Sequence, residues 1–348
     1  MDFNLDETQR ELKKLAAEVL ARDGDVGRLW ETGLMTVCVP EDAGGAGLGP
    51  VEMAVVLREV GAQAAPVPAL PTLVSTLTLA CYGTPDQQRR FTGPAEAPAR
   101  ERGTPVTGSA IGSDRFSLLS LALREPGRAP ADSPLTTARR SGDGWVLTGR
   151  KVAVPHPGAA VLVTADNGLF LAEHPPMTPE FTSTGEPAAT IVLDDTPAEQ
   201  VAGPEAVVGA RQLFMSAVAA QAAGVLAGAL ELTTAYIRTR KQFGRALAEF
   251  QAVTMQIADV YIAGRALDVA MWSAAWRLAE GLPAEQDLGL AAYHVSEAYK
   301  ALFTCQHLHG GLGLDVTYPL HRYFAQAKHL SHLLGGADAQ LDLIGALL

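Results

Sequence analysis

Cysteine, aromatic residues and positive charge are all scarce in this chain of 348 residues. The three cysteines, Cys38, Cys81 and Cys305, lie far apart and lack the short spacing of a metal site. We expect them to be buried thiols of a protein in a reducing cytoplasm. Lysine and arginine number 27 against 38 acidic residues, and the net charge of −11 argues against nucleic acid or an anionic membrane surface as a partner.

A long apolar run without polar residues is missing as well. The longest run, residues 213–230, is mostly alanine and glycine and is interrupted by Ser216 and Gln221. It favours a tightly packed bundle helix over a membrane span, and Gly224 and Gly228 would let a neighbouring helix come close. The first residues are acidic and amphipathic, unlike a signal peptide, so we expect a cytoplasmic protein without a membrane partner.

The pattern of apolar and turn residues predicts three successive regions. The first region, residues 1–116, is predicted to be helical. Helices are predicted after Asp6, at 51–60, at 69–82 and at 85–91. A glycine-rich stretch at 43–47 precedes the second of these helices. It lacks the Lys-Ser/Thr pair of a phosphate-binding loop and therefore predicts a turn.

The second region, residues 117–209, has the pattern of a small β-domain. Short apolar segments alternate there with Gly, Pro and Asp turns. Strands are predicted at 118–123, 144–147, 161–164, 169–172 and 191–193, with long polar loops at 126–134 and 175–186.

The third region, residues 210–348, is nearly all helix. Helices are predicted at 212–238, at 250–280, at 285–305 and from about Pro319, the last one broken at Gly335 and Gly336. Four long helices with short links predict an antiparallel bundle. The predicted fold class is therefore α+β and mostly α, with an N-terminal helical domain, a small middle β-domain and a C-terminal four-helix bundle.

The junction between the first two bundle helices is rich in cations. Arg238, Arg240, Lys241 and Arg245 lie within eight residues at the C-terminal end of a helix, where cations are favoured. Gly244 allows a left-handed turn there. Two interpretations stay open at this point. The junction is either a charged, capped helix–helix corner or an anion site in which guanidinium groups clamp a phosphate.

The junction resembles a signature of the acyl-CoA dehydrogenases. Arg240-Lys241-Gln242-Phe243-Gly244 with the later Phe250-Gln251 is similar to the Arg-x-Gln-Phe-Gly and Phe-Gln of that family. A second stretch, His309-Gly310-Gly311-Leu312-Gly313 followed by Tyr318-Pro319, is similar to its Gly-Gly-x-Gly and Tyr-Pro. The resemblance implies the family's fold of helical domain, β-domain and helical bundle.

The resemblance also implies FAD as the cofactor and an acyl-CoA that is desaturated between its α and β carbons. In family dimers both stretches reach across the interface to the FAD of the other subunit. The cofactor contacts that it assigns here are Arg240, Gln242, Phe243, Leu247, Phe250, Gln251, His307, Leu308, Gly310 and Gly311. Arg240 would meet the pyrophosphate and Gln251 the adenylate side, while His307 stands where the family has glutamine.

The residues that the family uses for the subunit's own flavin and for the general base are missing. The two usual positions of the base, a glutamate, fall on Leu334 or Gly335 and near Phe214, none of them acidic. The flavin-binding stretch keeps Glu125-Pro126-Gly127 but loses the Gly-Ser-Asp that follows it. The tryptophan that flanks the flavin ring is replaced by Ala153. We therefore expect no catalytic residue in this chain.

This pattern predicts a non-catalytic subunit of a heteromeric FAD-dependent acyl-CoA dehydrogenase. The chain is most similar to the base-less subunit of actinobacterial α2β2 enzymes that act on steroid side-chain CoA esters. It would complete the FAD site of a Glu-bearing paralogue, which would bind most of the acyl-CoA. Two alternatives stay open: a self-sufficient homo-oligomer with Asp338 or Glu205 as an unusual base, and a flavin-free structural paralogue.

No metal site is predicted, although six of the eight histidines lie after residue 290. His307 and His309 could in principle chelate, and His329 and His332 share a helix face. No Asp, Glu or Cys stands at a matching spacing beside either pair.

Overall fold

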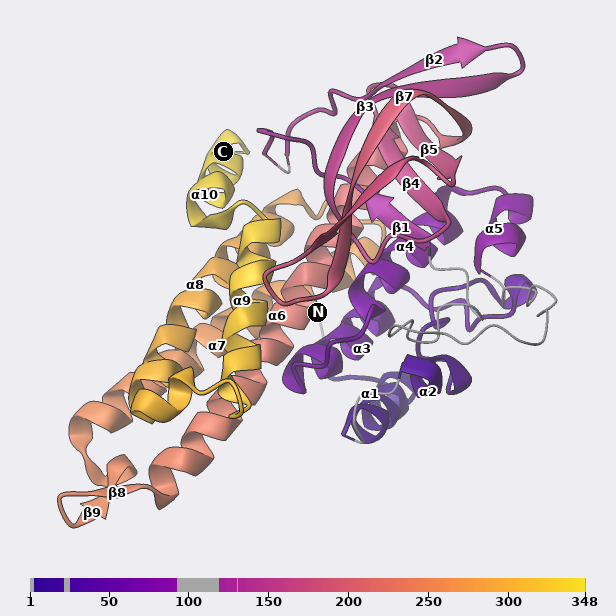
Figure 1. The fold of residues 1–348 in the computed structure, drawn as a ribbon. Helices are drawn as coiled ribbons and strands as arrows, with labels where there is room; N and C mark the ends of the chain where they lie inside the picture. The colour runs from indigo at the N-terminus through magenta and orange to yellow at the C-terminus, as the bar shows by residue number, and fades with distance from the viewer. Residues whose placement is uncertain (1–2, 22–25, 93–118, 130, 348) are drawn as a thin grey trace, which may run out of the picture.

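The computed structural model describes residues 3–21, 26–92, 119–129 and 131–347. A cluster of helices, a twisted sheet and a long helical bundle follow one another along the chain (Figure 1). The predicted fold class is confirmed. The predicted domain boundary between residues 116 and 117 lies outside the described residues.

The N-terminal region consists of short helices around a common apolar core. They are α1 (Glu7–Leu20), α2 (Val26–Glu31), η1 (Glu41–Ala43), α3 (Pro50–Ala62), α4 (Ala69–Tyr82) and α5 (Pro85–Thr92). α1 begins at a capping box, because Asp6 Oδ1 accepts the Gln9 N–H at 2.8 Å and the Gln9 side chain accepts the Asp6 N–H at 3.1 Å. The glycine-rich stretch at 43–47 forms the predicted turn before α3.

The middle region contains a seven-stranded sheet with the strand order β1-β4-β5-β7-β3-β2, and β6 pairs with β7. The strands are β1 (Leu119–Ala122), β2 (Thr137–Ser141), β3 (Gly144–Pro155), β4 (Ala160–Ala165), β5 (Gly168–Glu173), β6 (Met177–Phe181) and β7 (Pro187–Ala202). β1 and β4 are parallel, and the other pairs are antiparallel.

The predicted loop at 175–186 is wrong in part, because β6 lies inside it. β6 is mostly exposed, contains Pro179 and pairs only with β7, which is where a strand tolerates proline. β7 extends far beyond the predicted 191–193. The prediction missed its second half because that half is polar and partly exposed. The prediction depended on short apolar segments, which the exposed β6 and the polar half of β7 lack.

The C-terminal region is the predicted antiparallel bundle (Figure 1). Its helices are α6 (Pro204–Thr239), α7 (Gln251–Ala279), α8 (Glu285–His309) and α9 (Leu320–Leu333), followed by the short α10 (Gly336–Ala346). α6 lies at the centre and contacts α3, α4, α7, α8 and α9. Its apolar segment is long enough to cross a membrane, but 89% of that segment is buried inside the protein, as in the core helix of a bundle.

α3 crosses α6 at very short distance, as the small residues predicted. A Cβ atom on Gly224 would lie 1.9 Å from the Arg58 carbonyl oxygen, and one on Gly228 would lie 2.3 Å from that of Ala62. Side chains at either position would push the N-terminal helices away from the bundle.

α6 begins earlier than predicted, at Pro204 instead of residue 212. Gly209 weakens the helical pattern of this segment, since glycine is a poor helix former. The structure explains the glycine: a Cβ atom there would lie 1.8 Å from the Tyr82 hydroxyl oxygen, which packs against α6. The predicted boundary between residues 209 and 210 therefore falls inside this helix.

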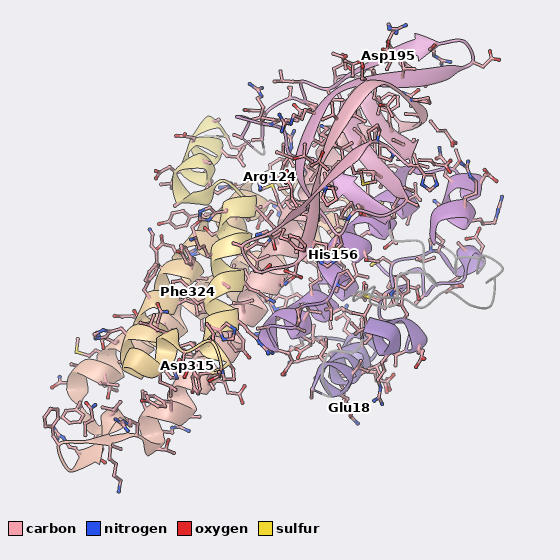
Figure 2. All side chains as sticks on the ribbon, in the orientation of Figure 1. Glu18, Arg124, His156, Asp195, Asp315 and Phe324 are labelled. Atoms are coloured by element: carbon pink, nitrogen blue, oxygen red, sulfur yellow. The ribbon has the colours of Figure 1, made fainter. Side chains whose placement is uncertain are left out.

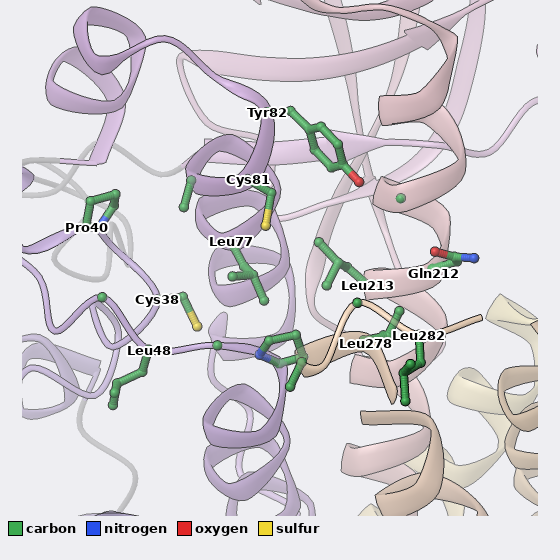
Figure 3. Close-up of a pocket in the computed structure, with 17 residues that line it drawn as sticks. Cys38, Pro40, Leu48, Leu77, Cys81, Tyr82, Gln212, Leu213, Leu278 and Leu282 are labelled. Atoms are coloured by element: carbon green, nitrogen blue, oxygen red, sulfur yellow. The ribbon is translucent and has the colours of Figure 1, made fainter. Parts of the chain in front are cut away.

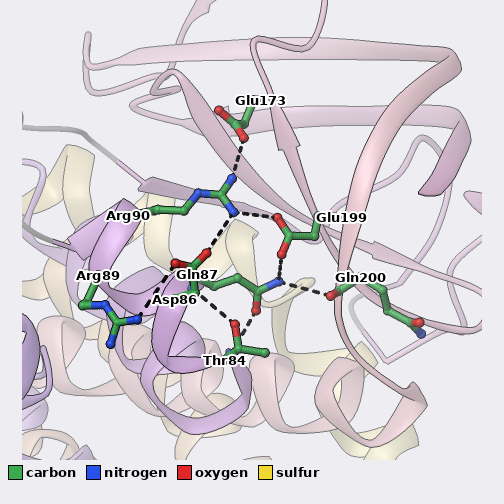
Figure 4. A network of polar contacts seen from close by, with 8 residues as sticks. All are labelled: Thr84, Asp86, Gln87, Arg89, Arg90, Glu173, Glu199 and Gln200. Atoms are coloured by element: carbon green, nitrogen blue, oxygen red, sulfur yellow. Dashed lines mark hydrogen bonds and ion pairs between the residues drawn. The ribbon is translucent and has the colours of Figure 1, made fainter. Parts of the chain in front are cut away.

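A polar network attaches α5 to the sheet (Figure 4). The Arg90 guanidinium lies 2.9 Å from Glu173 and 3.0 Å from Glu199, and Gln87 donates to Glu199 at 2.7 Å. Gln87 is buried, whereas the Arg90, Glu173 and Glu199 side chains are 40%, 54% and 44% exposed, so these ion pairs contribute little to stability.

Candidate functional site

The cation-rich junction forms a β-hairpin at the end of α6. Strands β8 (Lys241–Gln242) and β9 (Arg245–Ala246) pair through a two-residue turn made by Phe243 and Gly244. The φ angles of 51° and 81° are those of a type I′ turn, the turn that suits a two-residue hairpin. The Leu247 N–H bonds to the Arg240 carbonyl at 2.9 Å and closes the hairpin.

Phe243 is the most unusual residue of the hairpin. Its side chain is 91% exposed, and a bulky residue at positive φ is strained by roughly 1–3 kcal/mol. Glycine, asparagine or aspartate would relieve both the strain and the exposure of an apolar ring. A residue that is unfavourable on both counts in the isolated chain suggests a partner that covers it.

The cations of the hairpin are arranged in two ways. Arg245 lies over the Phe250 ring, with 4.0 Å between its Cζ and the ring centroid. The exposed Arg240 side chain has no hydrogen-bond acceptor or carboxylate partner among the described residues, and only its backbone is held, by the Tyr236 carbonyl at 2.9 Å. Arg240 therefore presents a free guanidinium at the end of the bundle, as a site for an external anion requires.

The remaining residues of the first stretch surround the hairpin. Gln242 and Gln251 are exposed, and Leu247 and Phe250 are half-buried. Phe243 and Phe250 meet edge to face with their ring centroids 6.3 Å apart. The stretch thus offers one exposed apolar edge, two amides and a cation on one small arm.

The second stretch follows α8 at the same end of the bundle. His307, Gly310 and Gly311 are exposed, whereas Leu308 is only 8% exposed and packs inward. Gly310 has φ 61° and ψ −139°, a conformation that is essentially restricted to glycine. Gln306, the neighbour of His307, donates to the Gly313 carbonyl at 3.3 Å and is thus engaged within the loop.

Tyr236 and His309 join the two stretches. Their rings stack with centroids 4.4 Å apart, and the Tyr236 hydroxyl lies 3.4 Å from the His309 carbonyl oxygen. The two parts of the expected cofactor site, about 70 residues apart in sequence, therefore lie side by side. The sequence analysis assigned no role to His309. The only hint in the sequence was that His309 belongs to the same motif as Tyr318 and that the other motif begins with an aromatic residue, Tyr236.

Comparison with known proteins decides the family. Residues 6–95 match the acyl-CoA dehydrogenase N-terminal domain and residues 215–348 match the acyl-CoA dehydrogenase C-terminal domain. Acyl-CoA dehydrogenase FadE28 of Mycobacterium tuberculosis is 38% identical over 99% of this chain and 98% of its own length. The chain belongs to the acyl-CoA dehydrogenase family.

Solved structures agree. The chain superposes on a structure titled as a steroid ACAD variant, Tcur3481-Tcur3483, with a TM-score of 0.85 at 35% identity, covering 98% of this chain and 97% of that one. The ChsE4-ChsE5 complex of Mycobacterium tuberculosis gives a TM-score of 0.86 at 29% identity over 99% and 98% of the two chains. The human mitochondrial short-chain specific acyl-CoA dehydrogenase is 26% identical over 99% of this chain and 88% of its own length.

The positions at which the sequence predicted the family's base to be missing hold no carboxylate, and of these Gly335 is exposed. Leu334 is fully buried, and Phe214 is 8% exposed on α6. The alternative carboxylates lie outside the core: Asp338 is exposed on α10, and Glu205 accepts the Gly203 N–H at 3.1 Å at the start of α6. An exposed carboxylate lacks the desolvated setting that tunes a catalytic base toward neutral pH.

A buried ion pair holds the β-domain together at the stretch where the sequence predicts the family's flavin contacts to be missing. Lys151 is fully buried, and its amine donates to Glu125 at 2.7 Å and to Thr164 at 3.0 Å. Burial alone would raise the pKa of Glu125, but hydrogen bonds from Lys151, Thr136 and Leu135 lower it to about 2. Burial lowers the pKa of Lys151 to about 8. Ala153, at the family's tryptophan position, has φ 50° in an irregular part of β3.

Polar side chains fill the space between the end of β3 and α9. His156 Nε2 lies 3.4 Å from Glu186 Oε1, and the two side chains are 15% and 20% exposed. His329 of α9 faces the same carboxylate: burial lowers its pKa, and Glu186 opposes that shift. Arg124, which Figure 2 labels, lowers the pKa of His329 as well. Charged protein groups thus stand beside the strand that flanks the flavin in the family.

A crevice of about 580 Å³ lies at the opposite end of α6 (Figure 3). Leucines from three helices line it, together with Cys38 and Cys81. Cys38 is buried as predicted, but Cys81 is exposed, contrary to the prediction, because the last turn of α4 opens into this crevice. Gln212, on its wall, is about 40 Å along α6 from Arg240, so the crevice is separate from the hairpin site.

Among the residues that the structure describes, no group of three His, Cys, Asp or Glu side chains could hold a metal ion.

Proposed function

We propose that this chain is the non-catalytic subunit of a heteromeric, FAD-dependent acyl-CoA dehydrogenase. It contributes Arg240, Phe243 and the Gly310–Gly311 loop to the FAD site of a paralogous subunit. That partner carries the catalytic glutamate and binds most of the acyl-CoA. One contrast carries the proposal. The hairpin has a free guanidinium and a strained, exposed aromatic ring, whereas the residues expected at the base positions, such as Leu334 and Phe214, carry no carboxylate.

The distance between the hairpin and the predicted base position near Phe214 supports a role of the hairpin across an interface. Phe214 and Arg240 are 26 residues apart along α6, which corresponds to about 40 Å. The hairpin therefore lies far from the β-domain side of its own chain. A cofactor that rests on the hairpin takes its remaining contacts from a second chain.

Exposed apolar residues on α7 support a stable partner as well. Met255, Ile262 and Val269 are 62%, 63% and 49% exposed and recur every seven residues. A heptad stripe of this kind is the pattern of a helix that packs against another helix. Leu290 of α8 extends the patch around a groove of about 630 Å³. Soluble monomers rarely leave a patch of this type uncovered.

The known relatives favour a heteromeric assembly and a steroid ester as the substrate. The matching structures are titled as a ChsE4-ChsE5 complex and as a Tcur3481-Tcur3483 steroid ACAD variant. We extend both properties to this chain as part of the proposal: a heterotetramer of two chains of each kind, acting on a steroid side-chain CoA ester.

Purification of the chain alone and together with a Glu-bearing paralogue tests the proposal. We expect a colourless chain alone and, in co-expression, a yellow heterotetramer with one FAD for every two chains, measured by flavin absorbance and native mass. A yellow homo-oligomer with one flavin per chain and activity would contradict the proposal and point to Asp338 or Glu205. A colourless heteromer would favour the flavin-free structural paralogue.

Phe243→Asn is expected to separate stability from function. Asparagine followed by Gly244 is the preferred type I′ turn, so the isolated chain should become more stable by up to about 1 kcal/mol. The complex should bind FAD roughly two- to tenfold more weakly, because an aromatic contact with the cofactor is lost. Thermal unfolding and FAD titration measure the two effects.

The control for this variant is Phe181→Asn, which removes a ring that is 78% exposed on β6 and has no positive φ. It should leave FAD affinity unchanged. FAD affinity that is unchanged in Phe243→Asn, or lowered equally in both variants, would mean that the hairpin ring has no cofactor role. Lower stability of Phe243→Asn would mean that Phe243 does not strain the turn.

A further inference from the structure

His309 is the most constrained histidine of the bundle end. It is 3% exposed, although Gly310 and Gly311 directly after it are exposed. Its Nδ1 lies 2.8 Å from the Cys305 carbonyl oxygen, its Nε2 lies 3.2 Å from the Tyr318 hydroxyl, and its ring stacks on Tyr236 at 4.4 Å. Three elements, α6, α8 and the segment before α9, therefore meet at one imidazole.

The hydrogen bonds assign the tautomer of this imidazole. A backbone carbonyl can only accept, so Nδ1 of His309 carries the proton and donates to Cys305. In the neutral ring Nε2 then accepts the Tyr318 hydroxyl proton. Burial lowers the pKa of His309, although its bond to the Cys305 carbonyl opposes this, and the neutral form agrees with the two bonds.

Hydrogen bonds to the backbone connect Tyr236 with both predicted cofactor-binding stretches. The Tyr236 carbonyl accepts the Arg240 N–H at 2.9 Å, and the Tyr236 hydroxyl lies 3.4 Å from the His309 carbonyl. Gly310, directly after His309, adopts its glycine-only conformation with no side chain to hold it. The position of the glycine loop relative to the Arg240 hairpin thus depends on the ring before it.

We propose that His309 is a positioning residue that holds the Gly310–Gly311 loop and the Arg240 hairpin in one arrangement. It acts as a neutral Nδ1–H imidazole between the Cys305 carbonyl and the Tyr318 hydroxyl. This inference rests on the proposed function for its link to FAD. The arrangement itself belongs to this chain and can be tested without the partner.

Tyr318→Phe and His309→Phe test the arrangement in the isolated chain. The first removes only the hydroxyl donor, and the second keeps a stacking ring without either nitrogen. Loss of one hydrogen bond should speed amide exchange of Gly311 to Gly313 roughly two- to tenfold. Histidine nitrogen NMR of the unmodified chain should show the Nδ1–H tautomer. The opposite tautomer, or unchanged exchange in both variants, would overturn the inference.

His332→Phe is the matched control. Its Nδ1 makes the same type of bond, to the Lys328 carbonyl at 2.8 Å, but the side chain is exposed on α9. It should leave exchange in the glycine loop unchanged. His309→Gln should restore part of the protection lost in His309→Phe, because its amide oxygen can accept the Tyr318 hydroxyl. In the Tyr318→Phe background, His309→Gln should restore no protection. Equal recovery of protection with and without the Tyr318 hydroxyl would also overturn the inference.

FAD titration of the complex separates this inference from the proposed function. If both hold, Arg240→Ala, Tyr318→Phe and His309→Phe all weaken FAD binding, the last two by roughly two- to tenfold. If only Arg240→Ala has an effect, His309 positions nothing that the cofactor uses, and the inference fails while the function stands. If Arg240→Ala has no effect, the proposed function fails, and the exchange experiment still decides the arrangement.

Discussion

Arg240→Ala is expected to weaken FAD binding by the complex by about 1.5–3 kcal/mol, or about ten- to 150-fold in Kd. The guanidinium has no acceptor within the described part of its own chain, so its removal breaks no internal contact. The stability of the isolated chain should therefore change by less than about 0.5 kcal/mol. FAD titration of the co-purified complex and urea unfolding of the single chain measure the two effects.

Arg238→Ala is the control for this result. Arg238 is exposed in the last turn of α6, two residues before Arg240, and has no partner among the described side chains. Its removal changes the net charge equally. An equal loss of FAD affinity in the two variants would mean that the cations act only through the overall electrostatic field of the protein. Unchanged FAD affinity in both variants would argue against a contact of Arg240 with the pyrophosphate.

Lys151→Met is expected to destabilise the chain by about 3–5 kcal/mol, because it leaves the Glu125 carboxylate buried without its cation. The Lys151 and Glu125 side chains are 0% and 4% exposed and lie 2.7 Å apart. The amine also holds Thr164 of β4 at 3.0 Å, so the variant loosens β3, β4 and the segment after β1 together. Urea unfolding followed by circular dichroism measures the loss.

Lys300→Met provides the matched surface pair. Lys300 lies 2.6 Å from Glu297, but the two side chains are 64% and 31% exposed, and pairs of this kind contribute about 0–1 kcal/mol. A cost of Lys151→Met no larger than that of Lys300→Met would show that the buried pair contributes little. A large cost would show that the pair holds the strands of the β-domain together without help from a cofactor.

The hairpin shows how far sequence reasoning reached at the site. Gly244 was predicted to permit a left-handed turn, and its φ of 81° confirms that. Phe243 at φ 51° was not predictable, because bulky residues avoid this region and only the two-residue pairing of Gln242 with Arg245 demands it. The sequence predicted a junction between two helices, and the tertiary structure shows that this junction is an exposed β-hairpin.

The β-domain shows a different limit. β3 and β7 were each predicted only over a short apolar segment, and both continue through polar residues that are held by pairing with each other. Strand pairing connects residues far apart in the chain, so local patterns cannot reveal it.

The sequence by itself determined the bundle and the family, and it led to the prediction that this chain has no catalytic base. Helical periodicity is local, and the identity of Leu334 or Phe214 needs no coordinates. The roles of Arg240 and the other predicted cofactor contacts remain predictions. Only the tertiary structure decided that Phe243 is uncovered, that Lys151 is buried against Glu125, and that His309 joins two stretches. Exposure and pairing depend on which distant segments pack together, and that information is spread over the whole chain.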